Sequence, residues 1–100
     1  MREFTNVLDA MIESLKGNSS DPAKKFIADL ERIKRDTGLT APEARWEIRG
    51  SQVSELLDRF MDEHKELPSW LIKLVSIFTT NDISSVEDTL EESGYIILAN

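Results

Sequence analysis

One pattern of apolar residues constrains the fold of this chain more than any other feature, because it recurs with the period of an α-helix. In residues 4–15 the apolar side chains fall at i, i+3, i+4, i+7, i+8 and i+11, on one stripe of a helix. The stripe consists of Phe4, Val7, Leu8, Met11, Ile12 and Leu15. A stripe of this width needs other apolar surface to cover it, so the pattern predicts a helix packed against further helices.

The same spacing returns in residues 53–64 and predicts a second strongly amphipathic helix. Its stripe consists of Val53, Leu56, Leu57, Phe60, Met61 and His64. Ser51 is the expected N-cap of this helix, and Pro68 is expected to break it. The polar residues of the two segments differ, so we infer no internal sequence repeat.

Residues that start and stop helices define a further helix between these two segments. Gly17 is expected in the left-handed position that follows the first helix. Asp21 as N-cap, with Pro22 in the first helical position, predicts a helix that runs to about Asp36 and is ended by Gly38. Its apolar face consists of Ala23, Phe26, Ile27, Leu30 and Ile33.

A short helix is predicted next, in front of the one that covers residues 53–64. Thr40 and Glu43 have the spacing of a capping box, and Pro42 lies in the first turn, where its ring is tolerated. We expect this helix to end at Gly50. It would carry Ala44, Trp46 and Ile48.

The last third of the chain predicts two more helices and an apolar tail. The helix over residues 68–79 is apolar around most of its circumference, which is typical of the middle of a bundle or of a subunit interface. Asn81 or Asp82 caps the last helix, which Gly94 ends. Its apolar residues are Ile83, Val86 and Leu90. The tail, residues 95–98, shows no strand partner elsewhere in the chain, so we expect it to pack on the bundle or to pair with a second copy.

These elements predict one all-α domain over residues 1–100, a compact bundle of five to six short amphipathic helices with an extended apolar C-terminal tail. A chain of 100 residues with 40% hydrophobic content can bury one core and has no room for a second domain. It lacks cysteine, which excludes a disulfide framework and indicates a cytoplasmic protein. We expect neither a signal peptide nor a membrane span, because the longest apolar stretch, residues 70–78, is far shorter than the required ~20 residues.

The chemistry-bearing residues do not form a recognisable catalytic or metal site. His64 is the only histidine, and we expect it to have a structural role, because helical geometry points Asp62 and Glu63 away from it. A histidine near a helix C-terminus is also favoured by the helix dipole. The sequence has no Gly-x-Ser-x-Gly turn and no glycine-rich phosphate loop. It therefore predicts a protein that is not an enzyme and has no catalytic, cofactor-binding or metal-binding residues.

Charge is spread unevenly along the chain. Residues 1–50 contain nine Lys or Arg and nine Asp or Glu, whereas residues 51–100 contain three and ten. The whole net charge of -7 therefore originates in the second half. A concentrated negative field favours a basic partner and disfavours nucleic acid or anionic lipid on that surface.

Seven acidic side chains in the second half are the predicted partner-binding residues. Helical counting places three of them on one face of the helix over residues 53–64, a fourth just beyond, and three more on the last helix. These residues, which we call the acidic ridge, are Glu55, Asp58, Asp62, Glu66, Asp88, Glu91 and Glu92. Such a ridge suits an immunity protein, an antitoxin or an inhibitor of a nucleic-acid enzyme, whose partner is a basic toxin or nuclease. A solvated acidic face explains the same residues equally well.

Two other functions compete with this interpretation. Residues 40–60 read as helix, turn at Gly50 and helix, an order that resembles a helix-turn-helix regulator. Basic residues that would contact DNA phosphates are Lys24, Lys25, Arg32, Arg35, Arg45 and Arg49. The acidic residues of its second helix would repel a polyanion, which disfavours nucleic acid as the partner. The third possibility is an assembly or chaperone subunit, such as a homodimer, in which residues 70–78 are buried only in the oligomer.

Overall fold

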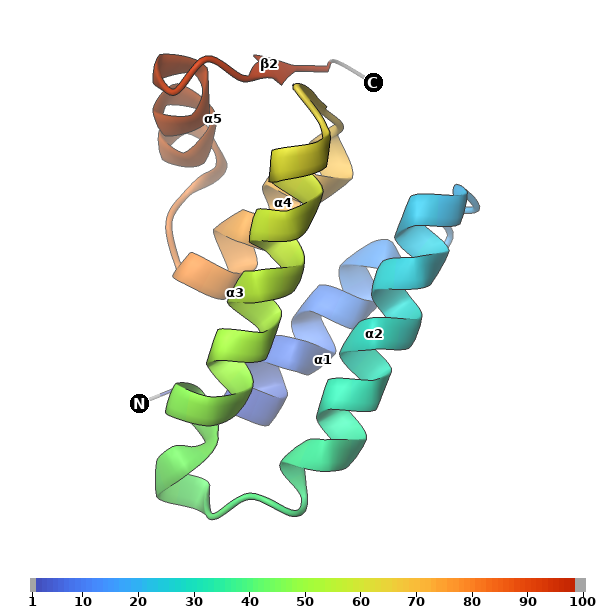
Figure 1. Cartoon of the computed structure of the whole chain (residues 1–100), viewed down its shortest axis with the longest axis vertical. Coiled ribbons are helices and arrows are strands. Elements are labelled where there is room, and N and C mark those ends of the chain that lie inside the picture. Colours follow the sequence, from blue (N-terminus) through green and yellow to red (C-terminus); the bar gives the residue numbers. More distant parts are fainter. Residues whose placement is uncertain (1, 99–100) are drawn as a thin grey trace.

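The computed structural model describes residues 2–98, in which helices dominate (Figure 1). In chain order the elements are α1 (Phe4–Leu15), α2 (Asp21–Thr37), the 3-10 helix η1 (Pro42–Ala44), α3 (Arg45–Glu63), β1 (Glu66–Leu67), α4 (Ser69–Thr79), α5 (Ile83–Glu92) and β2 (Ile96–Ile97). The prediction of a compact, mostly helical bundle is confirmed, and a two-stranded sheet is added to it.

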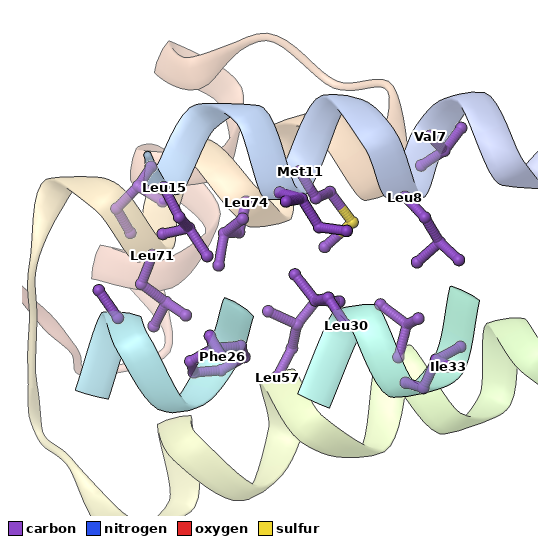
Figure 2. Close-up of a cluster of buried hydrophobic side chains, with 14 of the residues drawn as sticks. Val7, Leu8, Met11, Leu15, Phe26, Leu30, Ile33, Leu57, Leu71 and Leu74 are labelled. Atoms are coloured by element: carbon purple, nitrogen blue, oxygen red, sulfur yellow. The ribbon is translucent and has the colours of Figure 1, made fainter. Parts of the chain in front are cut away.

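Helix α1 lies at the centre of the bundle and packs against both α2 and α4. All six residues of its predicted stripe are buried, which confirms the periodicity argument. Figure 2 shows Leu8, Met11 and Leu15 of this helix facing Leu30 of α2, with Leu57 of α3 completing the layer. The core is therefore assembled from helices that are far apart in the sequence, as expected for side chains arranged on single stripes.

Helix α2 has the predicted extent to within one residue, but its N-cap is not the predicted one. Ser20 has the extended backbone of an N-cap, and Asp21 is already helical. Asn18 orders this turn, because its side-chain oxygen accepts hydrogen bonds from the backbone N–H and the hydroxyl of Ser20, at 3.0 and 2.8 Å. Gly17 has φ +89°, the left-handed conformation that the sequence predicted.

The predicted helix end and turn at Gly50 are wrong, because α3 runs through this position without a break. Gly50 is buried beside Trp46 and Phe4, whose rings pack edge to face with 5.0 Å between their centroids. The packing of Phe4 of α1 against Trp46 of α3 stabilises the helix by more than the roughly 1 kcal/mol that glycine costs inside it. The helix, turn and helix order read from residues 40–60 is thus not present.

The predicted capping box at Thr40 and Glu43 is also wrong, because the side chain of Thr40 has other partners. Its hydroxyl oxygen accepts a hydrogen bond from Nε of Arg49 at 2.8 Å, and its carbonyl oxygen accepts one from Nε of Arg45 at 3.2 Å. Both arginines reach back from the first turns of α3 to the loop that precedes it. This loop is therefore held by side-chain bonds from residues five and nine positions further along the chain, which the capping-box spacing does not reveal.

Replacement of Gly50 by alanine is expected to stabilise the protein by about 0.5–1 kcal/mol. A Cβ atom at Gly50 would lie 3.7 Å from Trp46 and 3.9 Å from Phe4, which is ordinary van der Waals contact. The matched change Gly17→Ala should instead destabilise by about 1 kcal/mol, because an L side chain is strained in the left-handed region. Urea unfolding of both variants measures the difference. A destabilised Gly50→Ala variant would indicate that the helix is interrupted at this residue.

Helix α4 begins one residue after the predicted Pro68 and ends at the predicted Thr79. It packs against α1 on one side and α5 on another, and it buries Leu71, Ile72 and Leu74. Residues 70–78 are thus partly covered within one chain, and their apolar character does not require an oligomer. Across residues 2–98, no helix combines the length and the apolar character needed to cross a membrane.

The C-terminal tail pairs within its own chain, which corrects the expectation that no strand partner exists. Strand β2 runs parallel to β1, with Glu66 opposite Ile96 and Leu67 opposite Ile97. The N–H of Ile96 donates to the carbonyl of Lys65 at 3.0 Å, and the N–H of Leu98 donates to that of Leu67 at 2.8 Å. Two residues are too few to show the alternating pattern of a strand, so β1 could not be predicted from the sequence. Residues 99–100, which follow the tail, lie outside the described residues.

Candidate partner-binding surface

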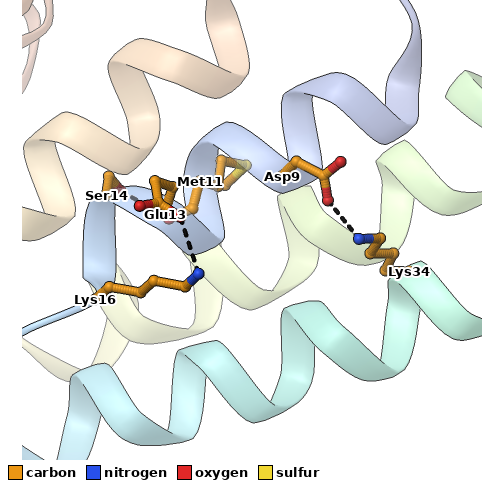
Figure 3. Close-up of polar contacts among 6 residues, drawn as sticks. All are labelled: Asp9, Met11, Glu13, Ser14, Lys16 and Lys34. Carbon is orange, nitrogen blue, oxygen red and sulfur yellow. Dashed lines mark hydrogen bonds and ion pairs between the residues drawn. The ribbon is translucent and has the colours of Figure 1, made fainter.

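Some charged side chains in the first half of the chain form ion pairs with one another. Asp9 of α1 pairs with Lys34 of α2 at 2.7 Å, and Glu13 pairs with Lys16 at 3.0 Å (Figure 3). The hydrogen bond from Lys16 to Glu13 and the negative charge of that carboxylate raise the pKa of Lys16. Residues 1–50 contain nine basic and nine acidic side chains, so this half of the chain has no net charge.

An acidic surface lies on the outer side of α3. Glu55, Asp58 and Asp62, which we call the α3 acidic face, are exposed and line one shallow hollow. The opposite side of the helix buries Val53 and Leu57 in the core. The prediction that these three carboxylates share a helix face is confirmed.

Arg59 is the only basic residue that lines this hollow. Its guanidinium group donates a hydrogen bond to the Glu55 carboxylate at 2.7 Å, and both side chains are largely exposed. Within residues 2–98, neither Asp58 nor Asp62 has a cation within ion-pair distance. The α3 acidic face thus keeps uncompensated negative charge that a partner cation can meet.

The other members of the acidic ridge are only partly joined to this face. Glu66 does not continue the helix, because α3 ends at Glu63 and Glu66 lies in β1. Asp88, Glu91 and Glu92 are exposed on α5. A second hollow, between the end of α3 and the end of α5, is lined by Asp62 and by the residues that follow Glu92, but by none of the three α5 carboxylates.

His64 lies outside the helix, which corrects the prediction that it sits in the apolar stripe. It is the C-cap of α3, has an extended backbone and is exposed. Its Nδ1 atom lies 2.9 Å from the Phe60 carbonyl oxygen, which can only accept a hydrogen bond, so Nδ1 is the donor. Its ring stacks on Phe60 with 4.0 Å between centroids and 11° between planes. The sequence predicted a helix C-terminus near His64, and the end of α3 at Glu63 confirms this prediction.

Phe60 belongs to a cluster of aromatic rings that joins three helices. Phe60, Phe26 of α2 and Trp70 of α4 contact one another edge to face, with centroid separations of 5.4 to 5.7 Å. Such edge contacts are favourable beyond the area that they bury. The cluster fixes the orientation of Phe60 and, through stacking, that of the His64 ring.

A groove between α2 and α3 opens above these rings and was not predicted from the sequence. Its volume is about 300 Å³. The α2 wall consists of Asp21, Pro22, Lys25, Phe26 and Asp29, and the α3 wall consists of Leu56, Arg59, Phe60, Glu63 and His64. We call it the α2–α3 groove. Phe26 and Phe60 were assigned to apolar stripes, but their proximity depends on how two helices pack.

No family model matches this chain, and no curated protein and no solved structure resembles it significantly. Among residues 2–98, no group of three or more His, Cys, Asp or Glu side chains is arranged to hold a metal ion. A function must therefore be argued from the surface chemistry of the chain itself.

Proposed function

We propose that this protein binds and neutralises a basic protein partner through the α3 acidic face, as an immunity protein, an antitoxin or an inhibitor of a nucleic-acid enzyme does. The observation that carries the proposal is the set of three exposed carboxylates around one hollow, with a single cation among them. A cysteine-free chain suits a partner met in the cytoplasm.

The surface is held on a rigid element, which lowers the entropic cost of binding. Helix α3 has 19 residues, and Gly50, Val53 and Leu57 are buried along its inner side. The carboxylates are thus placed before the partner arrives, and less ordering is needed on association. The exposed pair between Glu55 and Arg59 contributes little stability, so Glu55 can exchange its partner at small cost.

The charge of the whole chain supports the same class of partner. A net charge of -7 attracts a basic protein over several ångströms and increases the association rate at low salt. The same field repels nucleic acid. The regulator alternative also needs a turn at Gly50, where α3 is continuous.

The test is affinity capture from a lysate of the source cell with the full chain as bait. Removing the three charges in the variant Glu55→Gln, Asp58→Asn, Asp62→Asn is expected to weaken binding of a basic protein by about 100-fold at low salt. Mass spectrometry identifies the retained proteins, and calorimetry with the purified partner measures the dissociation constant. Raising the salt concentration should weaken the wild-type complex in the same direction.

The matched control removes three charges elsewhere, in the variant Glu31→Gln, Glu43→Gln, Glu47→Gln, whose side chains are exposed outside the α3 acidic face. It lowers the net negative charge equally and should retain the partner. If both variants lose the partner to the same extent, the overall charge of the chain determines binding, and the α3 acidic face is not a specific site. If neither loses it, or if only nucleic acid or the chain itself is recovered, the proposal is wrong.

A further inference from the structure

The α2–α3 groove combines an aromatic floor with a charged rim. Phe60 and the mostly buried Phe26 form the floor, and the exposed His64 ring is stacked on one face of Phe60. A volume of about 300 Å³ is at the lower end of the range for small-ligand pockets, which indicates room for one long side chain. Because the aromatic cluster orients these rings, the floor is present before a ligand binds.

Three carboxylates surround this floor. Asp21 and Asp29 lie on the α2 wall, and Glu63 lies on the α3 wall. In the part of the chain that the structure describes, Asp21 and Glu63 have no ion-pair partner, and Asp29 has only a long contact of 3.9 Å with Arg32. Two cations lie on the same rim: Arg59 is turned to Glu55 at 2.7 Å, whereas Lys25 has no ion-pair partner within residues 2–98. The rim therefore carries three carboxylates and two cations. The rim thus keeps acceptors for an incoming cation.

We infer that this groove binds an arginine side chain of the basic partner, an inference that rests on the proposed function. A guanidinium group is planar and stacks on aromatic faces, while its five N–H donors match carboxylates in pairs. The methylene groups of an arginine would cover the partly exposed Phe60 and Leu56, as long basic side chains do on apolar surface. The lysine ammonium group is a point charge that cannot stack on an aromatic ring. An apolar side chain would leave the carboxylates without a cation or a hydrogen-bond donor.

The groove is continuous with the α3 acidic face. Arg59 lines both hollows, and Glu63 in the groove follows directly on Asp62. A partner whose basic residues meet Asp58 and Asp62 would therefore have a neighbouring arginine within reach of the groove. The α3 acidic face would attract the partner at long range, and the groove would hold one of its side chains in a defined position. In protein interfaces, charged rims commonly increase the association rate and central contacts supply most of the affinity.

The test is a titration of the full ¹⁵N-labelled chain with four capped amino acids, followed by NMR. The probes are the Nα-acetyl amides of arginine, lysine, citrulline and phenylalanine. We expect the arginine probe to shift the signals of Phe26, Phe60 and His64, with a dissociation constant on the order of millimolar. Citrulline is planar and similar in shape but neutral, so it should bind at least about tenfold more weakly. Lysine should bind about threefold more weakly.

Three variants separate the rim from the floor. The double variant Asp29→Asn, Glu63→Gln should weaken arginine binding by about fivefold, and Phe60→Leu should do so while it keeps apolar volume. His64→Ala tests the exposed end of the floor with less risk to folding. The matched control Glu31→Gln, Glu43→Gln removes two exposed charges outside the groove and should leave binding unchanged.

Several results would overturn the inference. These are equal binding of arginine and citrulline, tighter binding of phenylalanine in the groove, and arginine shifts scattered over the surface. The titration contains no partner protein, so its result is independent of the capture experiment. A capture that ignores the α3 acidic face contradicts the proposed function alone, whereas an arginine probe that does not bind contradicts the groove assignment alone.

Discussion

Replacement of Leu30 by alanine is expected to lower the free energy of unfolding by about 3–5 kcal/mol. Leu30 is 0% exposed and lies in the core layer between α1 and α3 (Figure 2). Its truncation removes apolar contacts and leaves a cavity that helices held by neighbouring side chains fill only partly. Because small domains are stable by only about 5–15 kcal/mol, this single change would remove a large share of the stability.

Leu39→Ala provides the matched control, since it is the same substitution at a side chain that is 86% exposed. We expect its effect to stay within about 0.5 kcal/mol. Urea unfolding followed by circular dichroism measures both variants under the same conditions. A similar loss for the two would mean that Leu30 is not in the main core, and it would contradict the helix arrangement described above.

Helices whose limits are set by local residues were predicted well from the sequence. The stripe of α1 and the start of α4 behind Pro68 were located to within one residue. Their signals lie within a single turn or a single face, and such features depend little on the rest of the chain. The left-handed conformation predicted for Gly17 belongs to the same class, because only local backbone geometry decides it.

Features that depend on distant residues were missed. Glycine often ends helices, but contacts with Phe4 and Trp46 keep Gly50 inside α3. Strand β1 forms because β2 pairs with it. A two-residue segment has no periodicity from which this pairing could be predicted. In both cases tertiary packing overrides a local preference.

The candidate site likewise has one part that was predicted from the sequence and another part that was missed. Glu55, Asp58 and Asp62 were assigned to one surface by helical counting, because they lie on a single continuous helix. The α2–α3 groove was missed, because it needs the packing of two helices to bring Phe26 beside Phe60. Glu66 was misplaced because its predicted position assumed that the helix continues beyond Glu63.

Replacement of Leu67 by alanine is expected to cost about 2–4 kcal/mol and to release the C-terminal tail. Leu67 lies in a strand of only two residues, yet its side chain is 0% exposed in the core. Its carbonyl oxygen accepts the hydrogen bond from the N–H of Leu98 at 2.8 Å. A loss of core packing at Leu67 should therefore loosen β2 as well. Faster hydrogen exchange at the Ile96 and Leu98 amides would report this release.

Ile96→Ala is the matched change on the partner strand, and its side chain is 53% exposed. It should cost less than about 1 kcal/mol, because little apolar surface is lost. Melting at two protein concentrations completes the test. A tail that pairs within its own chain gives the same melting temperature at both, whereas exchange of the tail between two copies makes it depend on concentration. A concentration-dependent transition that Leu67→Ala abolishes would show that the strand pair forms between chains and would overturn the intrachain pairing.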